Sequence, residues 1–391
     1  GVTDVVMGGR EGSFAAFSGV DGSELWRVAP EDVAETPAPY NFTTPDLIGD
    51  VDGDGVTDLA VVYGGNALRK PGAPRDPSYL AVVSGRAGNV LAVHPSPDGA
   101  EMYSSVVAYE RPDGSLWLIF GTGGETHPGS EYRVPVASLL DGTFEDRLER
   151  LVPPGTKGVI APPTLVDLTG DGELDIVVST FDGRLVALAG ATGETLWQEQ
   201  GDNEEAYHQP AVARITSDGR IGFVLSRGIG YFPNYAGSVH RVLDGEDGHV
   251  LFEYTEPNYP AGAPLAVDLT GDGVDEPIFF TVRFPVAQGA RIHILDAVAD
   301  TLVTHDLTSD FWSTPAVADP RSTGTLELIG VTWSQGPSTG EEPTWRDLSW
   351  EMFRMDLSAP VPASLSWAGY MGTVNDAEYH PPGPVGGGEA P

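Results

Sequence analysis

The chain has 391 residues, with 57 acidic against 21 basic side chains, and its formal net charge at pH 7 is −36. This balance disfavours nucleic acid and anionic membrane surfaces as partners, since binding to a phosphate backbone needs a basic stripe. The absence of Cys excludes disulfides and thiolate chemistry. No apolar run reaches the roughly 18 residues that a membrane-spanning helix requires.

The first predicted element is half of a repeat unit. Residues 1–6 read Gly-Val-Thr-Asp-Val-Val and match residues 55–60, Gly-Val-Thr-Asp-Leu-Ala, almost residue for residue. Because residues 55–60 lead from a loop into a strand, the chain is expected to begin inside such a loop, without that unit's innermost strand. Gly1 is not an initiator Met, so a processed chain is expected, with any signal sequence upstream.

A nine-residue acidic loop then occurs three times with intact chemistry. The copies begin at residues 50, 167 and 268 and read Asp-Val-Asp-Gly-Asp-Gly-Val-Thr-Asp, Asp-Leu-Thr-Gly-Asp-Gly-Glu-Leu-Asp and Asp-Leu-Thr-Gly-Asp-Gly-Val-Asp-Glu. Oxygens at positions 1, 3, 5, 7 and 9 can form the cage of six or more oxygens that Ca²⁺ takes, and Gly at position 6 permits a sharp turn. An EF-hand would need Glu at position 12, where the chain has Val61, Val178 and Phe279. The loops are therefore expected to join strands rather than helices.

Apolar runs that read as short strands flank each loop. Residues 59–63, 176–180 and 278–282 follow the three loops, and closing strands contain the pairs Leu25-Trp26 and Leu196-Trp197. Degenerate copies of the loop begin at residues 109, 214 and 319, so successive loop starts are 47 to 59 residues apart. A period near 50 with four short strands per unit is typical of β-propeller blades.

We therefore predict an all-β fold, a seven-bladed β-propeller of four-stranded blades with the first blade split between the termini. The propeller is expected over residues 1–375, with blades near residues 1–30, 40–95, 102–150, 159–200, 207–255, 261–307 and 312–370. Residues 376–391 are expected to form a closing segment and a flexible Pro- and Gly-rich tail. In this interpretation Glu378–Pro382 supplies the missing innermost strand, because ring closure removes exposed sheet edges. Residues upstream of Gly1 are the alternative source.

With these loops in view, the chain resembles the FG-GAP or VCBS repeat family, the calcium-loop propellers also found in integrin α-subunits. Its closing strands also resemble quinoprotein-like propeller repeats. The resemblance implies about three Ca²⁺ ions, each held between the first and second strands of a blade. The side-chain ligands it implies are Asp50, Asp52, Asp54, Asp58, Asp167, Thr169, Asp171, Asp175, Asp268, Thr270, Asp272 and Glu276, to which Val56, Glu173 and Val274 add backbone carbonyls. Thr at position 3 and Glu at position 9 depart from the all-Asp pattern, which predicts weaker second and third sites.

The metals are expected to be structural. The carboxylates within one loop repel each other, and a cation that binds the folded state alone stabilises it by about 1–3 kcal/mol per site at moderate saturation. Calcium sites of extracellular modules bind with Kd values of about 10⁻⁴–10⁻³ M, so the loops favour an extracellular or cell-surface location, with the periplasm possible. The alternative is that each Asp-Gly-rich loop is only a turn.

Long loops gather at the other end of the predicted blades. Residues 64–78, 121–131, 228–237 and 334–349 are expected on the face shared by the second-to-third-strand loops and the connections between blades. Loops on a rigid scaffold commonly carry binding. The candidate residues for a protein or carbohydrate ligand are His127, Tyr231, Phe232, Tyr235, Trp345 and Arg346. Neutral insertion is the alternative interpretation of these loops.

The sequence contains no nucleophile elbow, zinc-protease helix or phosphate loop, so an enzyme is not expected. We predict a secreted or cell-surface, calcium-stabilised propeller that acts as a binding, adhesion or assembly module. One alternative is a lyase-like enzyme acting on polysaccharides. The other is a structural subunit of a surface array or filament, which would associate with itself.

Overall fold

The computed structural model describes residues 2–9, 12, 14–34, 41–65, 69–70, 72–102, 104–231, 234–283, 289–311, 313–335, 348–362 and 364–381. Strands dominate these residues, which contain one four-residue α-helix, α1 (Phe144–Arg147), and short 3-10 helices at Pro30–Asp32 and Val136–Leu139. Within this part of the chain no helix has the length and apolar character needed to span a bilayer. The predicted all-β class is confirmed.

The chain folds as two compact units. The first contains residues 1–163, 169–174 and 178–194, and the second contains residues 164–168, 175–177 and 195–391.

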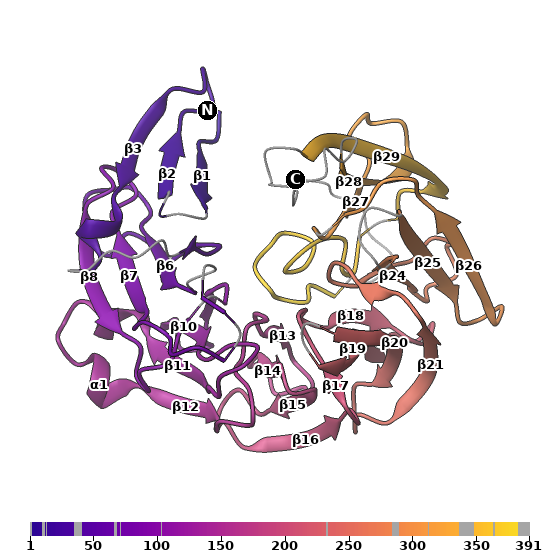
Figure 1. Cartoon of the computed structure of the whole chain (residues 1–391), viewed down its shortest axis with the longest axis horizontal. Coiled ribbons are helices and arrows are strands. Elements are labelled where there is room, and N and C mark those ends of the chain that lie inside the picture. Colours follow the sequence, from indigo (N-terminus) through magenta and orange to yellow (C-terminus); the bar gives the residue numbers. More distant parts are fainter. Residues whose placement is uncertain are drawn as a thin grey trace. The chain divides into compact units, whose positions relative to one another are not determined.

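Three antiparallel sheets belong wholly to the first unit (Figure 1). Sheet A contains β1 (Val5–Gly8), β2 (Phe14–Phe17) and β3 (Glu24–Val28). Sheet B contains β4 (Asn41–Phe42), β5 (Asp46–Leu47), β6 (Leu59–Gly64), β7 (Tyr79–Val83) and β8 (Val90–Pro95). Sheet C contains β9 (Val107–Glu110), β10 (Leu116–Gly121), β11 (Glu131–Pro135) and β12 (Glu149–Val152).

The remaining sheets follow the same order of strands. Sheet D, whose residues are shared between the units, contains β13 (Thr164–Val166), β14 (Asp175–Ser179), β15 (Arg184–Leu188) and β16 (Thr195–Gln200). Sheet E contains β17 (Glu204–Glu205), β18 (Ala211–Arg214), β19 (Ile221–Tyr231), β20 (Asn234–Asp244) and β21 (Val250–Glu256). Sheet F contains β22 (Tyr259–Pro260), β23 (Leu265–Val267), β24 (Glu276–Val282), β25 (Ala290–Asp296) and β26 (Thr301–Asp306), and sheet G contains β27 (Ala316–Ala318), β28 (Thr325–Gln335) and β29 (Leu348–Pro360).

Proline interrupts the first strand in three of these sheets. Sheets B, E and F each have two short pieces in that position, and Pro45, Pro210 and Pro264 lie between the pieces. Proline has no backbone N–H to donate to a neighbouring strand. The apolar, Pro-containing runs of the sequence therefore give broken innermost strands rather than continuous ones.

The core of the first unit lies between successive sheets. Along β6, Leu59, Val61 and Tyr63 pack with side chains of sheet A, whereas Ala60 and Val62 pack with side chains of sheet C. This alternation is the period-2 pattern of a strand that is buried on both faces. Face-to-face packing of this kind explains why β6 reads as an uninterrupted apolar run.

Two closing strands carry a Trp whose indole forms a hydrogen bond with the following sheet. The indole Nε1 of Trp26 donates to the carbonyl oxygen of Gly85 at 2.8 Å, and Nε1 of Trp197 donates to that of Gly245 at 3.0 Å. Both acceptors lie in the turn between the third and fourth strands of the following sheet. The Leu-Trp pairs seen in the sequence therefore join neighbouring sheets within a unit.

Two sequence predictions need correction. Sheet G has three strands among the described residues rather than four, whereas the three strands of sheet A agree with the expected half unit at the N-terminus. Residues 228–237 do not form a long loop, because β19 and β20 continue their pairing up to Tyr231 and Asn234.

The C-terminal segment packs on innermost strands of the second unit. Glu378 pairs with Leu165 of β13, through hydrogen bonds from Leu165 N to Ala377 O and from Tyr379 N to Leu165 O, both of 2.8 Å. The predicted closure of the first blade by residues 378–382 stays a prediction. Trp367, which is fully buried, forms a bridge with Ala266 of β23 in the same unit. The segment is held there because it satisfies backbone groups of innermost strands and buries a large indole.

Candidate functional site

The three acidic loops each connect the first and second strands of a sheet, as predicted. Loop 1 (residues 50–58) lies between β5 and β6, loop 2 (167–175) leads from β13 into β14, and loop 3 (268–276) leads from β23 into β24. The glycines at position 6, Gly55, Gly172 and Gly273, have φ values of 87°, 85° and 88°. This left-handed conformation is open to Gly at little cost, so the turn that the sequence predicts is present in all three loops.

The loops share a pattern of backbone hydrogen bonds. The amide of position 2 donates to the position-9 carboxylate in every loop: Val51 to Asp58 at 2.8 Å, Leu168 to Asp175 at 2.8 Å and Leu269 to Glu276 at 2.5 Å. The amide of position 7 donates to the position-5 carboxylate at 2.9 Å in every loop. Three separate segments therefore hold their carboxylates in one arrangement.

The position-9 carboxylates are buried while most of the others face solvent. Asp58, Asp175 and Glu276 have exposed fractions of 0%, 1% and 2%. In loop 1, ligand oxygens of Asp50, Asp52 and Asp58 lie within 4.8 Å of one another. Such a cluster of carboxylate oxygens fits a hard cation such as Ca²⁺.

Each loop also meets an arginine. Arg86 Nε lies 3.1 Å from Asp54 in loop 1, Arg111 Nε lies 2.6 Å from Glu173 in loop 2, and Arg214 lies 3.7 Å from Asp268 in loop 3. Charge crowding persists in loop 3 despite its arginine, since burial, together with Asp268 and Asp272, raises the pKa of Glu276 to about 7. An added cation would relieve this repulsion.

Among the predicted partner residues, His127 belongs to a charged cluster of the first unit. Its Nδ1 lies 3.0 Å from Thr126 Oγ1 and 3.8 Å from Glu101, whose other oxygen lies 3.1 Å from Arg75 Nε. Burial raises the pKa of Glu101 to about 7 although Arg75 opposes this shift, and burial with Arg75 lowers the pKa of His127. Sequence reasoning did not single out Glu101, which lies outside the long loops and follows an ordinary Pro-Asp-Gly turn.

The tyrosines of the β19–β20 hairpin have different roles. Tyr231 is 61% exposed, as a binding anchor requires. Tyr235 instead packs edge-on against Tyr259 at 5.3 Å between ring centroids and donates its hydroxyl to Glu205 at 2.6 Å. Burial is the main reason that the pKa of Tyr235 is raised. Tyr235 is therefore half-buried rather than fully exposed, because the extended hairpin turns its ring onto the protein, and its role in partner binding stays a prediction.

Phe232, Trp345 and Arg346 lie outside the described residues. Their predicted roles in partner binding therefore stay predictions.

Comparison with solved structures settles the fold. A europium-containing methanol dehydrogenase is similar over 85% of this chain and 71% of its own, with a TM-score of 0.57 and 12% identity. A quinohemoprotein alcohol dehydrogenase from Comamonas testosteroni is similar over 92% of this chain and 66% of the other, with a TM-score of 0.61 and 11% identity. These neighbours are β-propellers. The chain has a β-propeller fold.

At these identities the likeness concerns the fold alone. A second quinohemoprotein alcohol dehydrogenase, from Pseudomonas putida HK5, has a TM-score of 0.53 and 12% identity over 85% of this chain and 61% of the other. This chain thus spans less than two thirds of the length of both quinohemoprotein enzymes. No family model matches the sequence, and no curated protein matches it.

Proposed function

We propose that this β-propeller is a calcium-stabilised binding module that works outside the cytosol, of the kind found in the FG-GAP or VCBS repeat family. The observation that carries the proposal is the repetition, in three sheets, of one loop geometry around a buried carboxylate. The residues that would hold the ions are the fifteen named from the sequence, with positions 1, 3, 5 and 9 giving side-chain oxygens and position 7 a carbonyl. The ion would supply charge neutralisation, and the protein would supply the turn that gathers the oxygens.

The partner is proposed to bind where the second and third strands join. In the first unit this end of the sheets carries Arg75, Glu101 and His127, and in the second unit it carries exposed Tyr231. Such side chains suit a protein or carbohydrate ligand. Self-association into an array is a further form of the same proposal.

A thermal melt with metal counting tests the calcium role. We expect a higher Tm in millimolar Ca²⁺ than in chelator, and about three ions per chain by native mass spectrometry. Mg²⁺ is the control, because it demands a tighter octahedron than these loops offer. Equal melting temperatures in Ca²⁺ and chelator, with no bound metal, would show that the loops are acidic turns and not metal sites.

The Glu101 cluster favours a second candidate, a polysaccharide-active enzyme. A buried carboxyl whose pKa is about 7 can serve as a general acid or base near neutral pH, and Arg75 could hold the carboxylate of a uronic acid. Release of unsaturated products from acidic polysaccharides, lost in Glu101→Gln, would support this candidate. If the protein does not cleave such polymers, the enzyme candidate is excluded and the binding module remains the proposed function.

A further inference from the structure

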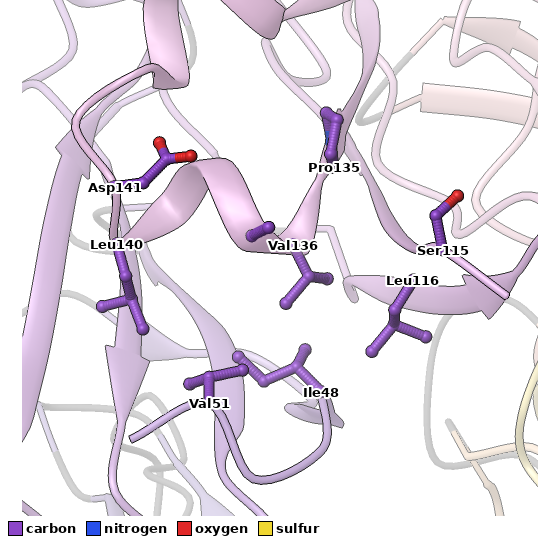
Figure 2. Close-up of a pocket in the computed structure, with 9 residues that line it drawn as sticks. Ile48, Val51, Ser115, Leu116, Pro135, Val136, Leu140 and Asp141 are labelled. Atoms are coloured by element: carbon purple, nitrogen blue, oxygen red, sulfur yellow. The ribbon is translucent and has the colours of Figure 1, made fainter. Parts of the chain in front are cut away.

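An apolar pocket of about 540 Å³ opens beside calcium loop 1 in the first unit (Figure 2). Figure 2 shows Ile48, Val51, Leu116, Val136 and Leu140 around one common space, with the carboxylate of Asp141 at its edge. This volume lies within the range of ligand pockets, roughly 300–1,000 Å³, and the mixture of apolar walls and a few polar groups is typical of them. The pocket lies at the calcium-loop end of sheets B and C, not at the end where the long loops gather.

An insertion in sheet C builds one wall of the pocket. Residues 136–148 connect β11 to β12, whereas the same connection takes only residues 84–89 in sheet B and 189–194 in sheet D. The insertion is anchored, since the Phe144 ring stacks on His94 at 4.1 Å between centroids and His94 Nε2 lies 2.9 Å from the Leu139 carbonyl oxygen. Leu139 and Phe144 are themselves part of the core. The pocket is therefore formed before any ligand arrives.

Calcium loop 1 builds the opposite wall. The amide of Val51 donates to the Asp58 carboxylate at 2.8 Å, and the amide of Ile48 donates to the Asp58 carbonyl at 3.0 Å. Asp58 is fully buried and is also the position-9 residue of loop 1. Whatever fixes Asp58 therefore also fixes the backbone of Ile48 and Val51, the two lining residues on this wall.

The charge around the pocket selects its occupant. Asp141 is held ionised, because hydrogen bonds from Thr143 lower its pKa, and the exposed carboxylates of loop 1 flank Val51. Arg147 is the neighbouring cation that faces Asp141, and the whole chain carries a net charge of −36. An apolar group that arrives with positive charge is therefore favoured over a neutral or acidic one.

We propose that this pocket receives an apolar side chain from a positively charged segment of a partner protein. We further infer that Ca²⁺ in loop 1 strengthens this binding by fixing Asp58; this second part rests on the proposed function. The site is separate from the long-loop end, so the propeller would have a partner site at each end of the sheets in the first unit.

Methyl NMR tests the first part with a defined probe. The full chain, with labelled Ile, Leu and Val methyl groups, is titrated with the blocked tripeptide Lys-Phe-Lys in millimolar Ca²⁺. We expect shifts at Ile48, Val51, Leu116, Val136 and Leu140. Lys-Ala-Lys should bind about tenfold or more weakly because it buries no ring, and Glu-Phe-Glu should bind more weakly because the rim is acidic.

Leu140→Arg should weaken Lys-Phe-Lys binding about tenfold, while Leu196→Arg is the matched control. The two leucines are 39% and 40% exposed, so both variants should fold. The proposal is overturned if the methyl shifts fall elsewhere, if none occur, or if both variants bind alike. Equal binding of Glu-Phe-Glu would overturn the positively charged partner and assign the pocket to neutral apolar ligands.

A calcium series tests the second part independently. Lys-Phe-Lys should bind several-fold more tightly in Ca²⁺ than in chelator, and this gain should vanish in Asp52→Asn of loop 1 but persist in Asp171→Asn of loop 2. If native mass spectrometry shows bound Ca²⁺ while peptide affinity stays constant, the coupling fails and the proposed calcium role stands. If no metal binds but the peptide shifts persist, the proposed calcium role fails and the pocket stands.

Discussion

Replacing Gly88 with Ala should loosen the junction between sheets A and B. Gly88 lies in the turn between β7 and β8 with a φ of +72°, and a Cβ there would lie 2.9 Å from Cδ2 and Cε3 of Trp26. Gly22 occupies the same place in the turn between β2 and β3, with a φ of +73° and nothing within 4 Å of its Cβ position. Both turns close with backbone hydrogen bonds of 2.8 Å. Comparing Gly88→Ala with Gly22→Ala therefore separates the cost of backbone strain, which both variants share, from the cost of the clash with Trp26, which only Gly88→Ala has.

The two costs can be estimated from these distances. A left-handed φ costs a non-Gly residue about 1 kcal/mol, which both variants should lose. Carbon atoms prefer separations of about 3.5–4.0 Å, so the Trp26 ring must move by several tenths of an ångström in Gly88→Ala. That movement also stretches the 2.8 Å hydrogen bond from Trp26 to Gly85. Overpacking of this kind costs about 1–3 kcal/mol, which is the expected difference between Gly88→Ala and Gly22→Ala.

Urea denaturation in saturating Ca²⁺ measures this difference. The midpoint should fall further for Gly88→Ala than for Gly22→Ala, and Trp26→Phe should reduce the gap because a smaller ring leaves room for the methyl group. Interaction between neighbouring substitutions is the expected signature of a shared contact. Equal losses in the two Gly variants would refute the idea that Gly88 is required by the Trp26 ring.

Three further variants probe buried carboxyl groups. Glu131 is fully buried, and burial raises its pKa well above the ordinary 4.5; the folded state then holds a proton that the unfolded state releases. Glu131→Gln should therefore gain stability relative to the parent by about 1.4 kcal/mol per pH unit above about 4.5, up to the folded pKa, and a pH-independent difference in urea midpoints would contradict this. Asp58→Asn should lower the free energy of unfolding by about 1–3 kcal/mol, because a side-chain amide cannot accept from the N–H groups of both Val51 and Gly85. It should also reduce the calcium-dependent rise in Tm by about a third. Asp113→Asn, in a degenerate loop, is the control and should leave that rise unchanged. Tyr235→Phe should cost about 1.5–3 kcal/mol through its lost bond to Glu205, whereas Tyr231→Phe, at an exposed site, should stay within about 0.5 kcal/mol in the same denaturation assay.

The propeller and its loops are predictable because their signals are local and repeated. A nine-residue loop places its oxygens by its own turn, so Asp50, Gly55 and Asp58 suffice to predict the geometry around one centre. The strand alternation is equally local, and repetition along the chain converts it into a fold. In loops 1 and 3 the amides of positions 4 and 6 both donate to the position-1 carboxylate, as expected where these three positions hold the same residue types at the same spacing.

The hairpin of sheet E shows where local signals mislead. Its glycines suggest a long turn, but a Cβ at Gly228 would lie 2.8 Å from the Tyr235 ring, and one at Gly237 would lie 2.3 Å from the Glu256 carbonyl oxygen. Both glycines are needed for close packing of extended strands, not for a turn. The environment of Tyr235 depends on Glu205 and Tyr259, which are distant in sequence, so spacing alone could not reveal it.

The pocket escaped prediction for a related reason. Its walls come from residues 48–51, from residues 115–116 at the start of β10 and from residues 135–141, and no single segment has an unusual sequence. The only local signal is length, since residues 136–148 exceed the matching connections of other sheets. Comparing connection lengths between repeats, rather than residue types, would have drawn attention to this wall.

Two of the three degenerate loops, those that begin at residues 109 and 214, contribute to the intact loops although they lack a metal site of their own. Arg111, in the degenerate loop of sheet C, forms an ion pair of 2.6 Å with Glu173 of loop 2. Arg214, in that of sheet E, lies 2.6 Å from the buried Asp275 and 3.7 Å from Asp268 of loop 3. Each of these loops lacks carboxylates that a cation needs and instead gives a guanidinium to the next intact loop. In a chain with only 21 basic residues, placing arginines there reduces repulsion where carboxylates are closest, and leaves the remaining charge for a metal to neutralise.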